Sequence, residues 1–146
     1  MIRESTIRPL GYLRRVHTDA PDELFAMLFY FRREDDTSTG GALEIFRWKE
    51  NTPRFFVGSE VDECDVERVT TIPYEANTLV AFINSDHSLH AVSKRSPSIV
   101  SRRLVNIMGR VRDSVPDGLF VKRQKKDLVS LGRRALQRYR IAMNQF

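Results

Sequence analysis

The 146-residue chain has a single cysteine, Cys64, so it cannot form an internal disulfide, and a lone thiol suits a reducing compartment. No apolar run approaches the roughly 18 residues that a membrane-spanning helix needs. The first residues, MIRESTIRPLGYLRR, lack the apolar core of a signal peptide. These absences argue against a disulfide-stapled secreted protein and against membrane insertion. They predict a cytoplasmic protein.

Net positive charge is absent outside the end of the chain. Residues 117–146 hold eight Lys and Arg against two Asp, a net charge of +6, so the whole-chain value of +5 leaves −1 for everything before them. A basic domain would indicate a nucleic-acid partner. Here the charge is confined to one segment that carries no known recognition motif. A nucleic-acid-associated domain using this tail is therefore an alternative that ranks last.

Helical periodicity is absent before this tail, whereas short strand patterns are frequent. The run 23–31 (ELFAMLFYF) is dense in apolar residues and predicts a strand buried on both faces. Residues 2–13 can supply one further strand. The remaining strand-like runs are 42–48, a short one around Phe55 to Val57, 68–72, 78–83, one beginning in SLHAVS, and 101–111. Such a series predicts an all-β barrel or sandwich.

The tail differs from the rest. From Asp127 onward, apolar residues fall at helical spacing and predict an amphipathic C-terminal helix. They are Leu128, Leu131, Ala135, Tyr139, Ala142 and Met143. The chain thus divides into a β core over 1–118 and a basic helix over 119–146 that packs on the core or extends from it.

Histidine is also scarce, with His17, His87 and His90 only. His17 and Asp19 are two residues apart, so in a strand they point to the same face. Two histidines and one carboxylate on one face, with open positions opposite, suit non-haem Fe(II). By itself, a His-x-Asp pair is more often a surface turn. A closed structural zinc site that uses Asp19 and all three histidines is a further alternative.

Four segments, in order across residues 11–109, resemble strands of the Fe(II)- and 2-oxoglutarate-dependent dioxygenases, in the prolyl-4-hydroxylase-like branch. They are GYLRRVHTDAPDELFAMLFYF, GGALEIFRW, PYEANTLVAFINSDHSLHAV and SRRLVNIMG. The resemblance implies a double-stranded β-helix, the jelly-roll or cupin-like core. It also implies Fe(II) and 2-oxoglutarate as cofactors and O2 as cosubstrate, and it allows ascorbate.

The resemblance implies roles for particular residues. His17 and Asp19 match the first two iron ligands of the family. His90, in the sequence HAV, matches the third. His87 is the alternative, in a shorter form of the motif that has proline where this chain has Ala91. The resemblance therefore implies a metal and catalytic set of His17, Asp19 and His90.

The far carboxylate of 2-oxoglutarate needs a cation, and arginine meets a carboxylate through two parallel hydrogen bonds. Arg102 matches the family position, with Arg103 as the alternative, since neighbouring strand residues face opposite sides. Tyr30 matches a tyrosine that donates to the same carboxylate, or else it is a core aromatic. The acidic run 34–36 predicts a solvated loop, and Trp48 and Cys64 receive no role.

The resemblance thus implies a hydroxylase of a protein side chain, prolyl-type, or of a small metabolite, producing succinate and CO2. A non-catalytic cupin-like module that binds a metal or ligand is the alternative. Family members have helices ahead of the His-x-Asp strand, whereas 16 residues precede His17 here. We therefore expect a minimal version or a fragment with an open sheet edge, which a homodimer would cover.

Overall fold

The computed structural model describes residues 3–4, 14–50 and 60–111. Within these ranges the chain forms eight strands and one short 3-10 helix, η1 (Glu63–Asp65), and no described helix is long and apolar enough to cross a membrane. The strands are β1 (Arg3–Glu4), β2 (Arg14–His17), β3 (Glu23–Tyr30), β4 (Leu43–Trp48), β5 (Val66–Ile72), β6 (Thr78–Ile83), β7 (Leu89–Val92) and β8 (Leu104–Arg110).

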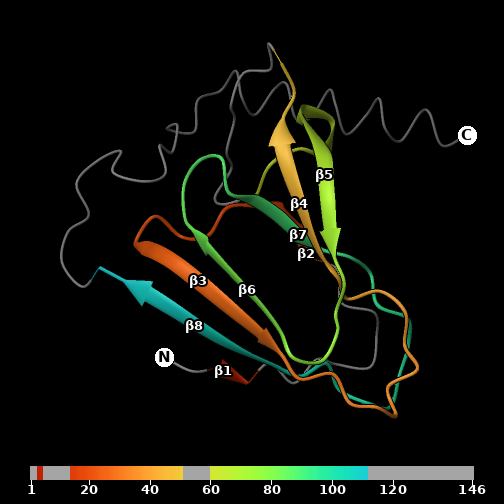
Figure 1. Ribbon diagram of the computed structural model, residues 1–146. Helices are drawn as coiled ribbons and strands as arrows, with labels where there is room; N and C mark the ends of the chain where they lie inside the picture. The colour runs from red at the N-terminus through yellow and green to blue at the C-terminus, as the bar shows by residue number, and fades with distance from the viewer. Residues whose placement is uncertain (1–2, 5–13, 51–59, 112–146) are drawn as a thin grey trace, which may run out of the picture.

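The strands form two four-stranded antiparallel sheets, which lie in separate layers (Figure 1). The first sheet has the order β1-β8-β3-β6 and the second has the order β2-β7-β4-β5. A mainly β protein with two antiparallel sheets confirms the fold class at that level. The strand expected around 55–57, the C-terminal helix and the boundary at residue 118 lie outside the described residues.

The central strand of the first sheet, β3, directs alternate side chains to its two faces. Tyr30 and Ala26 point inward and are buried, whereas Phe25 points outward and is 39% exposed. The prediction that this run is buried on both faces is therefore wrong for its outer side. The dense apolar run reflects an uncovered apolar face, because no other described layer packs against it.

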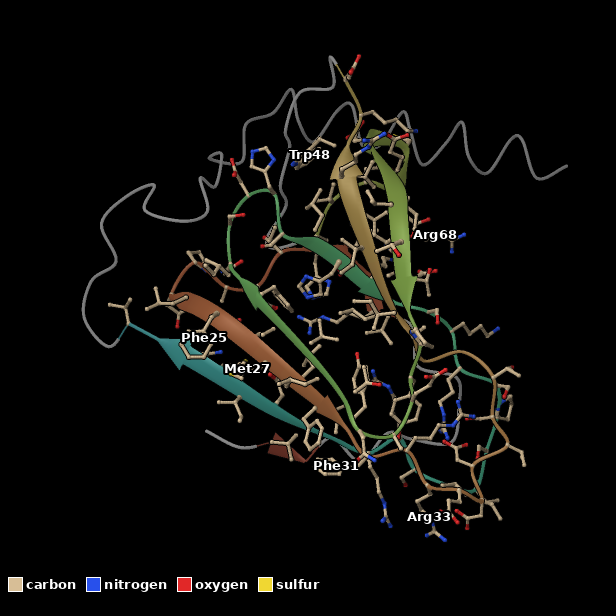
Figure 2. All side chains as sticks on the ribbon, viewed as in Figure 1. Phe25, Met27, Phe31, Arg33, Trp48 and Arg68 are labelled. Carbon is tan, nitrogen blue, oxygen red and sulfur yellow. The ribbon has the colours of Figure 1, made fainter. Side chains whose placement is uncertain are left out.

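Apolar side chains continue across this outer face. Figure 2 shows Phe25 and Met27 along β3 and Phe31 just past its end. The ring of Phe25 lies directly over Gly109 of β8, because a Cβ at Gly109 would be 2.3 Å from that ring. The glycine thus leaves room for the ring to cover β8. The exposed large hydrophobic residues on this side are Phe25, Phe31, Leu79, Ile83 and Ile107. These residues are neighbours across β3, β6 and β8 and form one exposed apolar surface among the described residues.

The connection from β3 to β4 passes close to the segment that follows β7. Gly40 and Gly41 have φ angles of 79° and 73°, which favour glycine. A Cβ at Gly40 would lie 2.0 Å from the carbonyl oxygen of Lys94, so only glycine fits there. This close approach brings Gly41 beside the arginines that follow β7.

Candidate metal centre

His17 and His90 come from neighbouring strands of the second sheet and face each other directly. The β2–β7 ladder pairs the two residues, and their ring centroids are 4.2 Å apart. Asp19 lies two residues past the end of β2. Its Oδ1 is 3.9 Å from His17 Nε2 and 3.6 Å from His90 Nε2. All three side chains are buried, so the sheet pairing assembles a compact, water-poor group.

Both imidazoles are oriented by backbone carbonyls. His17 Nδ1 lies 2.7 Å from the carbonyl oxygen of Arg15, and His90 Nδ1 lies 2.9 Å from that of Ser88. A carbonyl can only accept, so each Nδ1 carries the proton and donates it. Each Nε2 therefore presents a lone pair on the side of Asp19. Metal-binding histidines are held in the same manner, because the second nitrogen's bond sets tautomer and ring orientation.

Electrostatics keep both rings neutral. Burial, together with the neighbouring His90 and Arg14, lowers the pKa of His17 to about 3. Burial also lowers the pKa of His90, although the carboxylate of Asp19 opposes that shift. Neutral imidazole is the form that binds metal ions. His17 Nε2 is buried and has no hydrogen-bond partner, a deficit that a metal ion would satisfy.

The spacing of the three ligand atoms fits one ion. Nitrogen and oxygen ligands lie about 2.1 Å from a small divalent ion, so two of them can be at most about 4.2 Å apart. Both distances to Asp19 meet this limit, and all three ligand atoms lie within 4.8 Å of one another, so the two imidazole nitrogens exceed the limit by at most about 0.6 Å. His17, Asp19 and His90 could therefore hold a metal ion.

The competing histidine lies apart from this group. The His87 side chain is 61% exposed, and its Nε2 is 3.6 Å from Asp86. The described residues thus offer three protein ligands and no closed four-ligand zinc site. Three ligands leave positions open, as a catalytic metal requires.

Asn84, which directly follows β6, ties the loop after Asp19 to the other sheet. Its buried side-chain amide donates to the carbonyl oxygens of Ala20 (2.8 Å) and Glu23 (2.9 Å). On the same strand, the Phe82 ring lies 4.8 Å from His90. Sequence reasoning missed Asn84, whose one signal is an amide directly after a strand. The group of His17, Asp19 and His90 is thus supported by residues from both sheets.

Arg102 and Arg103 are separated as alternation predicts, although they precede β8 instead of lying on it. Arg102 is buried, whereas Arg103 is exposed. Arg102 Nε donates to the carbonyl oxygen of Gly41 at 3.1 Å. Its guanidinium carbon lies 5.0 Å from the ring centroids of both Tyr30 and Tyr74. The structure therefore places one arginine, between two aromatic rings, inside the protein.

Tyr30 is fully buried beside this arginine. Burial raises the pKa of its hydroxyl, while the charge of Arg102 opposes the rise, so the phenol keeps its proton at neutral pH. The hydroxyl makes no hydrogen bond of good geometry with the described residues. It is a buried donor that a ligand can satisfy. Sequence reasoning missed Tyr74, the second aromatic residue beside Arg102.

The inner face of the first sheet contacts the group of His17, Asp19 and His90 near one end and Arg102 near the other. Phe82, which touches His90, pairs with Ala26 of β3. Tyr30, which touches Arg102, lies four residues after Ala26 on β3. At the rise of a strand, this places Tyr30 about 13 Å from Ala26. The inner face of the first sheet therefore contacts both groups, the first through Phe82 and the second through Tyr30.

The acidic run 34–36 is only partly the solvated loop that was predicted. Asp36 is buried, with its side chain 1% exposed, and Arg95 Nη2 donates to both of its carboxylate oxygens at 2.8 Å. The prediction is wrong for Asp36 because its partner comes from a loop far away in the sequence. Glu34 and Asp35 are exposed as expected.

Comparison of the chain with family models, with curated proteins and with solved structures found no match. Function is therefore inferred from the geometry of the site. The identity of the ion and the roles of Arg102 and Tyr30 stay predictions.

Proposed function

We propose that this protein is an Fe(II)- and 2-oxoglutarate-dependent dioxygenase that hydroxylates a protein side chain, of prolyl type, or a small metabolite. The observation that carries the proposal is the convergence of two neutral imidazole Nε2 atoms and one carboxylate in a buried group with open positions. Two histidines and a carboxylate are the donor set of non-haem Fe(II) oxygenases.

The fold we propose is the jelly roll, or double-stranded β-helix. The strand order supports it: β1-β8-β3-β6 in one sheet and β2-β7-β4-β5 in the other. Eight antiparallel strands in two sheets that exchange consecutive strands are typical of jelly rolls and cupins. In such a fold, the inner faces of both sheets contribute to one site, as His90 and Phe82 do here.

Arg102 and Tyr30 would bind the distal carboxylate of 2-oxoglutarate. A buried guanidinium offers a fixed fork for a carboxylate, and the protonated phenol beside it offers a further donor. The inner face of β3 and β6 contacts both groups, through Phe82 at His90 and through Tyr30 at Arg102, so one cosubstrate between the sheets could reach both. The cosubstrate would then reach from the arginine to the ion.

The protein's own groups would bind the ion, orient its ligands and exclude water from the site. His17, Asp19 and His90 would hold Fe(II), and the carbonyls of Arg15 and Ser88 keep the imidazoles in place. When bound with 2-oxoglutarate, the ion supplies oxidative chemistry in which O2 and 2-oxoglutarate become succinate and CO2 and one oxygen atom enters a substrate C–H bond.

Anaerobic titration with Fe(II) and then 2-oxoglutarate tests the proposal, followed at the visible charge-transfer band. We expect a band that requires both components, and succinate on admission of O2. Metal binding without the band or succinate would instead indicate a non-catalytic cupin-like module. Binding to nucleic acid that collapses with modest salt would favour the third alternative.

A further inference from the structure

We propose that the buried ion pair between Asp36 and Arg95 is a positioning device that holds Arg102 in its binding orientation. The inference deepens the proposed function, on which its cosubstrate-binding part rests. Its structural part concerns only how Arg102 is held, and it can be tested without any ligand.

The pair is built from two distant loops. Asp36 lies between β3 and β4, and Arg95 lies between β7 and β8. Besides the two bonds to Asp36, Arg95 donates from Nε to Ser38 Oγ and from Nη2 to the carbonyl oxygen of Val100, each at 2.8 Å. Ser38 in turn donates to Asp36 Oδ1 at 2.6 Å. The guanidinium and the carboxylate are thus buried, paired and hydrogen-bonded from several sides.

Burial opposes ionisation of Asp36, but hydrogen bonds from Ser38 and Arg95 outweigh it and hold the pKa of the carboxyl below its usual value. The pair is therefore charged at neutral pH. Buried ion pairs add little net stability, because desolvation offsets their attraction. The main effect of this pair would then be to fix the position of neighbouring groups.

Gly41 connects the pair to Arg102. A Cβ at Gly41 would lie 3.4 Å from the Cδ of Arg95 and 3.5 Å from the Cδ and Nε of Arg102, so this glycine is packed between both arginines. Its carbonyl oxygen accepts from Arg102 Nε. When the pair fixes the loop that carries Gly41, it fixes the acceptor that orients Arg102.

Arg32 connects the loop that carries Asp36 to Tyr74. It donates to the carbonyl oxygens of Asp36 (2.8 Å), Ser38 (2.6 Å) and Tyr74 (3.1 Å). Tyr74 forms one of the two aromatic walls around Arg102. The loop held by the ion pair therefore contacts both the acceptor and one wall of the arginine.

The test compares Asp36→Asn with Asp35→Asn. Asp35 is on the same loop but forms an exposed pair with Arg33, so its variant is a matched control. Ser38→Ala is a milder second variant, and it serves if Asp36→Asn does not fold. It removes one hydrogen bond to Arg95 and one to Asp36 without stranding a charge.

The first measurement needs no ligand. The Nε–H proton of Arg102 is followed by NMR, with its signal assigned from an Arg102→Lys variant. Because the bond to Gly41 shields it, we expect slow exchange with solvent in the wild type and in Asp35→Asn. Exchange should be at least about tenfold faster in Asp36→Asn, as expected when a shared network loses about 1.4 kcal/mol. Equal exchange in all three proteins would overturn the positioning role.

The second measurement is the dissociation constant for 2-oxoglutarate. Asp36→Asn should raise it about tenfold, a coupling of 1.4 kcal/mol, while Fe(II) affinity stays within about twofold. In an Arg102→Ala background the same change should have no further effect. An equal effect in that background would mean that the pair does not act through Arg102. If the wild type does not bind 2-oxoglutarate but the exchange result holds, the positioning role stands and the proposed function falls.

Discussion

His17 and His90 face each other across the β2–β7 ladder with their ring centroids 4.2 Å apart, and Asp19 Oδ1 lies within 3.9 Å of both Nε2 atoms. The pairing of two strands far apart in the sequence creates this contact. Each ring is held by its own backbone carbonyl, so the two Nε2 atoms are preorganised before any ion arrives.

His17→Ala and Asp19→Ala should each abolish iron-dependent conversion of 2-oxoglutarate to succinate, because each removes a metal ligand. Circular dichroism should show that the β fold is retained. Fe(II) titration and succinate assay measure the effect. Wild-type turnover in either variant would exclude this group as the iron site.

His90→Ala should lose Fe(II) binding, whereas His87→Ala should keep most of it. His90 lies within the buried group, and His87 is exposed beside Asp86. Isothermal titration of both variants distinguishes them. The reverse result would move the ligand to His87 and require a rearrangement of the segment before β7.

Arg102→Ala should raise the dissociation constant for 2-oxoglutarate by at least about thirtyfold, as expected when one partner leaves a desolvated ionic pair. Arg103→Ala should change it less than about threefold, because exposed arginines contribute little. Lysine at position 102 should rescue binding only partly, since it lacks the planar fork. If neither alanine variant affects binding, the cosubstrate is not 2-oxoglutarate.

The metal-free protein should lose stability as the pH falls from about 6.5 toward 3. In that window unfolded His17 binds a proton that native His17, with its pKa of about 3, does not. The unfolded state then binds more protons, so the free energy of unfolding falls with pH by about 1.4 kcal/mol per unit for this one group. Denaturant unfolding between pH 4.5 and 7.5 measures the slope.

Two variants isolate the contribution of His17 to this slope. His17→Gln should flatten it, and the exposed control His87→Gln should leave it unchanged. An unchanged slope in His17→Gln would show that the imidazole is protonated in the native state.

The open apolar face of the first sheet should support the homodimer expected from the sequence. Ile83 lies on the edge strand β6, which carries no charged residue, and it is 72% exposed. Ile83→Lys should weaken self-association, whereas Val69→Lys, which alters an exposed residue of the other sheet, should not. Sedimentation equilibrium tests this. A monomeric wild type would contradict it.

The strands were largely predictable because alternation is a local property. The run 78–83 was predicted with the bounds that β6 has. The His-x-Asp spacing predicted a shared strand face, but Asp19 lies past the end of β2, so the segment after the strand brings it to His17. Local patterns also indicated that only one of Arg102 and Arg103 faces inward. They could not show which of the two faces inward, since that depends on how the segment before β8 packs against Tyr30 and Tyr74.

Tertiary structure decided what no local pattern carries. It brought His90 opposite His17 and left His87 exposed, because the strand register, and not the spacing within SDHSLHAV, selects the partner. It also turned Asp36 from an apparent loop residue into half of a buried pair, since its partner Arg95 approaches only when the loops beside Gly40 and Gly41 close on each other. Sequence alone determined the strand-forming segments and the chemistry of the donors. Long-range strand pairing and burial determined which donors meet.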